Sequence, residues 1–199
     1  MNHKVSTIYF LFLLSVVLAT ALLLMQESQG DVLAEVHVLD VGQGDSIFIQ
    51  ATNGKQLLID GGKSSSVLTE LAKVMPRGDR SIDVVIATHP DADHIGGLPL
   101  VFERYDVGLF LTSQVSTDTE VFKTLNEIIV EKNIPSFFVR RGMNLRLDDT
   151  LVTDFSILFP DRDTTGWDTN TASVVGKLKI GNKIEINKND QAIFRFEII

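Results

Sequence analysis

Four side chains that can bind a metal ion stand within six consecutive positions of this chain. They are His89, Asp91, Asp93 and His94, in the stretch of residues 88–97. Two imidazoles and two carboxylates form a mixed nitrogen and oxygen site, which suits zinc, manganese or iron. A pair of such ions can activate water and hold the attacking and leaving oxygens of a phosphodiester. The competing interpretation is a solvated acidic turn with two incidental histidines.

The elements on either side of this stretch are expected to bring the four side chains together. Residues 84–87 predict a buried strand, because β-branched residues dominate the run. Pro90 disfavours helical dihedrals at His89, so the segment is predicted to leave the strand as an extended loop. Residues two apart in an extended chain point the same way, which would make the candidate ligands converge. Gly96 and Gly97 then allow a tight turn before the next helix.

The rest of the chain predicts a mixed α/β domain built on a substantial sheet. Strands are expected at 35–40, 46–51, 56–60, 82–87, 107–112, 136–139, 151–159, 172–180 and 192–199, and helices at 65–74, 98–105 and 119–131. Strands that alternate with helices are typical of a sheet covered by helices. No internal repeat or low-complexity segment interrupts this order.

Composition limits the classes of protein to which the chain can belong. It has 199 residues, of which 44% are hydrophobic and 22% charged, as in one globular domain with a short appendage. The net charge of −8 argues against broad, non-specific attraction to nucleic acid, although a local basic patch is compatible with it. The absence of cysteine excludes disulfides and thiol catalysis.

The amino-terminal segment predicts a membrane anchor. Residues 8–25 form an apolar run interrupted by only two polar residues, and as a helix they would extend about 27 Å, close to the thickness of a bilayer core. Lys4 before the run is expected to keep the amino terminus in the cytoplasm and place the domain outside. We therefore expect residues 1–30 to comprise the cytoplasmic end, anchor and linker, and residues 31–199 the domain. The alternative is a cleaved signal peptide and a secreted domain.

Four blocks of the chain, in this order, resemble the metallo-β-lactamase-like domain of ComEC-type competence proteins. The blocks are residues 39–46, 58–62, 88–97 and 170–175. In that family a membrane channel carries DNA inward, and this domain on the outer side is proposed to be a nuclease that degrades one strand. The resemblance implies an αββα sandwich with one or two metal ions, zinc or manganese, at the strand ends.

The resemblance also implies roles for single residues. His89, Asp91, Asp93 and His94 would be metal ligands, and Asp60 a neighbouring acid that orients them, although Asp60 can equally be a turn residue. Asp93 would in addition accept a proton from the attacking water. Many relatives have a histidine where this chain has Asp91, and a carboxylate there favours a harder ion such as manganese.

Further residues of the matching blocks are expected near the ligands. Asp45 would lie beside them in the turn after the first strand, and Asn170 and Ser173 would contact substrate from a loop. The alternatives are an ordinary hairpin turn and a turn that leads into a strand. Arg140 and Arg141 either meet a phosphate or form a solvated surface.

The family pattern breaks after the last matching strand. Relatives have a Thr-Gly-Asp-type block and a His-His-Gly-Ser-type block there, whereas no histidine follows His94 in this chain. We therefore expect the second half of the sandwich to be largely missing. A truncated product, a degenerate binding remnant and a domain completed by a partner protein are the competing explanations.

The expected function is a membrane-anchored, metal-dependent hydrolase of phosphodiester bonds in DNA, whose activity depends on how much of the site is complete. One alternative is a non-catalytic module on the outer membrane face that binds metal, DNA or another protein. Another is a metallohydrolase of a different ester or amide substrate, such as a lactam or thioester.

Overall fold

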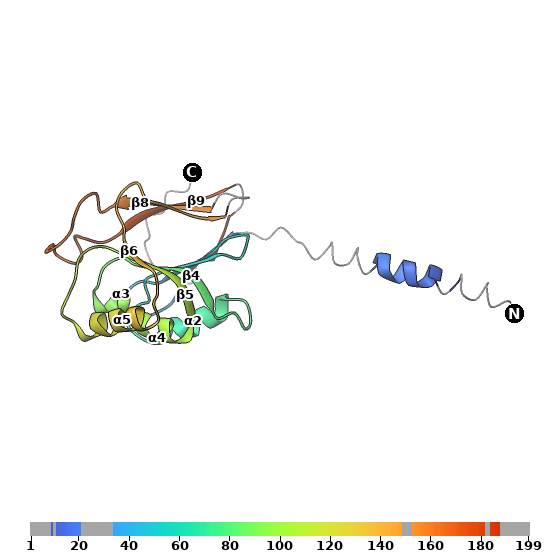
Figure 1. Cartoon of the computed structure of the whole chain (residues 1–199), viewed down its shortest axis with the longest axis horizontal. Coiled ribbons are helices and arrows are strands. Elements are labelled where there is room, and N and C mark those ends of the chain that lie inside the picture. Colours follow the sequence, from blue (N-terminus) through green and yellow to red (C-terminus); the bar gives the residue numbers. More distant parts are fainter. Residues whose placement is uncertain (1–8, 10, 21–33, 149–152, 182–183, 188–199) are drawn as a thin grey trace. The chain divides into compact units, whose positions relative to one another are not determined.

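The computed structural model describes residues 9, 11–20, 34–148, 153–181 and 184–187. The chain divides into two units, residues 1–32 and 33–199, and each is described by itself. In the first unit, Tyr9 and residues 11–20 are helical (Figure 1). No helix in the described ranges is long and apolar enough to cross a membrane. The predicted span of residues 8–25 extends outside those ranges, so the anchor stays a prediction.

A seven-stranded mixed sheet organises the domain, in the order β10-β1-β2-β3-β4-β5-β6. The strands are β1 (Ala34–Val38), β2 (Ile47–Gln50), β3 (Gln56–Ile59), β4 (Ser81–Ala87), β5 (Asp106–Thr112), β6 (Ser136–Phe138) and β10 (Ile184–Asn187). Strand β2 is antiparallel to β1 and β3, and β3 to β6 run parallel. The carboxyl ends of β1, β3, β4, β5 and β6 therefore meet at one edge, called here the carboxyl edge.

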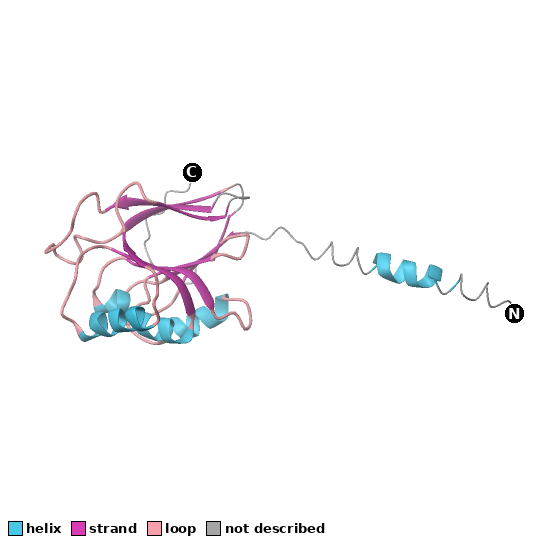
Figure 2. Cartoon of the chain, in the orientation of Figure 1, coloured by secondary structure: helices cyan, strands magenta, loops and turns pink. Residues whose placement is uncertain are grey.

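A second, antiparallel sheet packs on one face of the first, and helices cover the other face (Figure 2). The second sheet holds β7 (Asn144–Asp148), β8 (Thr153–Phe159) and β9 (Val175–Ile180), and the helices are α2 (Ser66–Val74), α3 (Ala92–Ile95), α4 (Leu98–Arg104) and α5 (Glu120–Glu131). The predicted mixed α/β class is confirmed. Strand β7, strand β10 and helix α3 were not predicted, and the strand expected at 192–199 lies outside the described residues.

Two hydrophobic cores lie on opposite faces of the large sheet. Phe48, Leu58 and Val85 point toward the helices, while their neighbours Ile49 and Leu57 point toward the small sheet. This alternation follows from the two-residue period of a strand. Because both faces are buried, the central strands are apolar throughout, which explains why they were easy to locate in the sequence.

Two strands of the small sheet, β8 and β9, match the strands predicted at 151–159 and 172–180, and β7 adds a third. The inner face of the small sheet buries Phe155 and Leu178 against the large sheet. In the part of the chain that is described, no helix covers its outer face, where Asp154, Ser156 and Lys177 lie on β8 and β9. These polar side chains stand beside the exposed Leu158 and Val175 on the same two strands. The expected partner that covers this half of the domain stays a prediction.

Candidate metal centre

The candidate ligands lie at the carboxyl edge, directly after β4. His89 is only 4% exposed, and Asp91 has extended dihedrals (φ −75°, ψ 145°). The prediction that the chain leaves the strand as an extended loop holds as far as Asp91. It is wrong beyond that point, because α3 begins at Ala92 and places Asp93 and His94 on a helical turn. Asp93 therefore does not follow the two-residue alternation that was expected to align it with His89.

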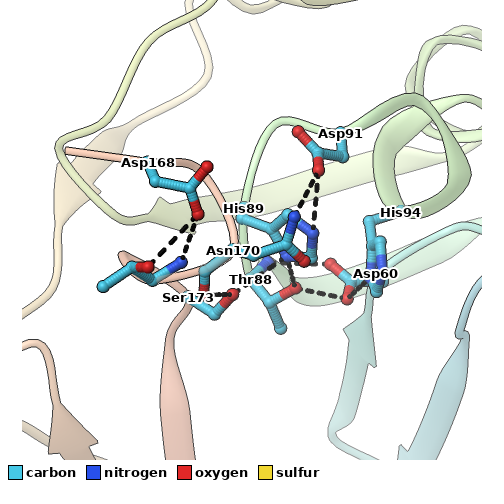
Figure 3. Close-up of polar contacts among 9 residues, drawn as sticks. Asp60, Thr88, His89, Asp91, His94, Asp168, Asn170 and Ser173 are labelled. Carbon is cyan, nitrogen blue, oxygen red and sulfur yellow. Dashed lines mark hydrogen bonds and ion pairs between the residues drawn. The ribbon is translucent and has the colours of Figure 1, made fainter. Parts of the chain in front are cut away.

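Asp60 connects the ends of β3 and β4 and holds His94. Its carboxylate is 2% exposed and accepts hydrogen bonds from the backbone N–H and the hydroxyl of Thr88, at 2.7 and 2.6 Å. Its Oδ2 lies 2.8 Å from Nδ1 of His94 (Figure 3). Asp60 thus stands where an orienting acid was predicted, and its left-handed backbone (φ 58°) turns the carboxylate back toward β4.

The rings of His89 and His94 lie against each other, with centroids 4.0 Å apart. Nδ1 of His89 is 3.0 Å from the hydroxyl of Thr88 and 3.2 Å from that of Ser173. Each imidazole therefore contacts the protein through Nδ1. Metal-binding histidines commonly engage an oxygen through one ring nitrogen and use the other for the ion. Nε2 of His89 also lies 3.6 Å from Oδ2 of Asp91.

The surroundings give the two histidines different pKa values. Burial lowers the pKa of His89, and the neighbouring ring of His94 lowers it further. Burial also disfavours the charged form of His94, but the hydrogen bond with Asp60 and the nearby carboxylates outweigh it and raise its pKa. Burial raises the pKa of Asp45, since it removes that carboxylate from water. The structure therefore favours a neutral His89 with a lone pair available to an ion.

The loop that precedes β9 contacts the candidate ligands directly. The Asn170 amide donates to Oδ2 of Asp91 at 3.0 Å, and the Ser173 hydroxyl reaches His89 as well as the carbonyl of Asn170 (Figure 3). Both residues were expected to contact substrate. In the structure they contact Asp91 and His89, which sequence reasoning missed because these contacts join residues about 80 positions apart. Their contact with substrate stays a prediction.

The turn after β1 closes the other side of the site. Gly62 donates its N–H to the carbonyl of Asp45 at 3.0 Å, which joins this turn to the end of β3. Gly44 has a φ of +83°, and a Cβ added to it would lie 1.5 Å from the carbonyl oxygen of Asp93. Asp45 therefore lies near the candidate ligands, and its carboxylate acts electrostatically on His94.

The imidazole and carboxylate groups of the site suit a divalent ion, although they do not all surround one common position. Among the described residues, no three histidine, aspartate or glutamate side chains are grouped so that they could hold a metal. They form two pairs, His89 with Asp91 and His94 with Asp60. Two imidazoles anchored through Nδ1, with carboxylates beside them, are chemically suited to zinc or manganese. The ligand roles of His89, Asp91, Asp93 and His94 remain predictions.

Comparison with known proteins places these residues in a family context. The family model described as the metallo-beta-lactamase superfamily matches residues 39–174, more than half of the chain. ComE operon protein 3 of Bacillus subtilis is 24% identical over 158 residues, which cover 71% of this chain and 20% of that protein. The exodeoxyribonuclease WalJ of Streptococcus pneumoniae is 28% identical over 91 residues, 46% of this chain and 34% of that one.

The similarity to solved structures is low. The Zn²⁺-bound PqqB of Methylobacterium extorquens is 17% identical, with a TM-score of 0.45 over 70% of this chain and 50% of that one. The chain spans between a fifth and about a third of the length of the two curated relatives.

Proposed function

Because this chain belongs to the metallo-β-lactamase superfamily, we propose that it is a metal-dependent hydrolase that cleaves phosphodiester bonds of DNA. The choice of substrate is supported by the similarity to a protein named as an exodeoxyribonuclease and to ComE operon protein 3. The resemblance of the blocks at 39–46 and 88–97 to competence-type domains supports it as well.

The observation that carries the proposal is the pair of adjacent imidazoles at the carboxyl edge. His89 and His94 are 4.0 Å apart between ring centroids, and each is held at Nδ1 by an oxygen-bearing side chain. A buried and a half-buried histidine held only for packing would not need Asp60, itself 2% exposed, to orient one of them. Burying the Asp60 carboxylate is energetically unfavourable. A buried carboxylate that orients a histidine is typical of sites that bind an ion.

Each residue has a distinct task in the proposed reaction. A bound zinc or manganese ion would supply a Lewis acid and lower the pKa of water. His89 and His94 would hold it through Nε2, with Asp91 and Asp93 as carboxylate ligands. Asp93, exposed on the first turn of α3, would also accept a proton from water. Asp60 would keep the proton of His94 on Nδ1, so that Nε2 offers its lone pair.

Cleavage of a labelled single-stranded oligonucleotide by the purified full chain tests this function. We expect cleavage with added zinc or manganese, its loss with a chelator and its return with metal. His89→Ala and His94→Ala should abolish it. His37→Gln is the matched control, because His37 lies on β1 with its ring 2.9 Å from Glu35. Cleavage that persists with chelator, or no cleavage with either metal, would count against a metallohydrolase.

A non-catalytic binding module is the second candidate. It is favoured by the absence, in the described ranges, of three side chains grouped to hold a metal. Such a module would retain DNA or another protein without turnover, so the same experiment, combined with a binding assay, separates the two functions.

We further propose that residues 8–25 anchor the domain outside the cytoplasm. The apolar run and Lys4 support this placement. The full chain should then sediment with membranes, and added protease should digest the domain in intact spheroplasts. Recovery of the chain in the soluble fraction would contradict the anchor.

A further inference from the structure

The end of the edge strand β6 presents an aromatic side chain and an arginine that the candidate metal centre does not use. Phe137 and Phe138 are 58% and 57% exposed, and the side chain of Arg140 is 47% exposed. These two exposed rings therefore stand beside an exposed cation on a chain whose net charge is −8.

Arg140 lies at the same sheet edge as His89. Strands β4, β5 and β6 are parallel neighbours (Figure 1), and His89, Gln114 and Arg140 each follow the end of one of them. Two strand spacings separate β4 from β6, or about 10 Å. A nucleic acid strand with one phosphate at His89 and His94 would therefore place a neighbouring nucleotide near Arg140.

Neighbouring side chains hold the guanidinium of Arg140 in place. It donates to the side-chain oxygen of Gln114 at 2.8 Å, and the carboxylate of Asp163 lies 3.8 Å away. The hydrogen bond to Gln114 uses one of five N–H donors, and a phosphate would compete with the carboxylate of Asp163 for the others. Arg141 differs, because its Nε donates to the backbone carbonyl of Leu158.

Phe138 and Arg140 lie on either side of a buried residue at the end of β6. Val139 donates its N–H to Thr112 and is 1% exposed in the core between the sheets. Phe138 is the last residue of β6 and Arg140 lies two residues further on, which is about 7 Å along an extended chain. Phe137 shares the face of Val139. A base stacked on Phe138 could thus have its phosphate beside Arg140.

We propose that Phe138 and Arg140 form a subsite for one nucleotide of a single-stranded DNA substrate. The base stacks on the phenyl ring, and the guanidinium binds the phosphate. This inference rests on the proposed function and extends it, since it assigns a place for the strand beyond the reacting phosphate.

Binding of a fluorescein-labelled thymidine 12-mer with hydrolysis-resistant phosphorothioate linkages tests the subsite. Anisotropy is measured on the full chain with manganese, at salt concentrations between about 50 and 200 mM. Arg140→Ala should weaken binding about tenfold and reduce the slope of log Kd against log salt by about 0.7. Arg140→Lys should restore the slope. Phe138→Ala should weaken binding about 5- to 150-fold without changing the slope.

Two variants provide matched controls. Phe137→Ala removes an equally exposed ring on the opposite face, and Arg77→Ala removes an exposed cation beyond α2, at the other edge of the sheet. Neither should change affinity. If the wild type binds the strand and Arg140→Ala and Phe138→Ala bind it equally well, the subsite is refuted while the proposed function stands. If the wild type does not bind the strand, DNA is refuted as the substrate together with the subsite.

Discussion

Replacing Asp60 with asparagine is expected to lower the affinity for zinc or manganese by about 10- to 100-fold, since orienting partners of metal-binding histidines contribute on this scale. The carboxylate accepts three hydrogen bonds, two from Thr88 and one from His94. An asparagine presents one oxygen and one donor group, so at least one of the three partners would face another donor. We also expect the free energy of unfolding to fall by roughly 2–3 kcal/mol.

The backbone makes this substitution a clean test of the carboxylate. Asp60 has a φ of 58°, and asparagine tolerates that left-handed conformation well. Asp83→Asn is the control, because Asp83 on β4 also accepts a backbone N–H, from Gln56, but lies at the opposite end of the strand. Urea denaturation and metal titration are the measurements. Equal metal affinity for Asp60→Asn and Asp83→Asn would refute the orienting role.

Gly44→Ala is expected to destabilise the domain by roughly 3 kcal/mol. The added methyl group would lie 1.5 Å from the carbonyl oxygen of Asp93, so either the turn or α3 has to move. At this chain length the loss corresponds to a fall in Tm of roughly 6–12 °C. Because α3 carries Asp93 and His94, metal-dependent cleavage should fall with it.

Gly42→Ala separates this clash from backbone strain. Gly42 has a similar φ of +80°, but a Cβ there meets nothing within 4 Å. Gly42→Ala should lower the free energy of unfolding by only about 1–2 kcal/mol, the strain of a left-handed alanine. Thermal unfolding of both variants, with cleavage assayed below their transitions, is the measurement. Similar Tm values and similar activities would show that the turn does not pack against Asp93.

The position of the site was predictable, because local signals define it. The apolar run before Thr88 marks a buried strand, and Pro90 marks the extended exit from it. The course of the chain after Asp91 was not predictable in the same way. Ala92 to Ile95 form a single helical turn, which is too short to leave a periodic pattern, and it moved Asp93 out of line with His89.

Contacts between residues far apart in the chain could not be predicted from the sequence either. Asn170 and Ser173 were identified as residues near the metal, but only the fold shows that they touch Asp91 and His89. Thr88 was overlooked, although its position immediately before a candidate ligand was a usable signal, and it connects Asp60 to His89. Strand β7 of the small sheet was missed because it is short and carries polar residues on its exposed face.

The central claim, that His89 and His94 together bind a divalent ion, is tested most directly by zinc and manganese titration of the full chain with calorimetry. Wild-type protein and His37→Gln should bind an ion with the same affinity, and His89→Ala and His94→Ala should each lose that binding. A wild-type chain that binds neither ion, or single histidine variants that bind as tightly as the wild type, would contradict the claim.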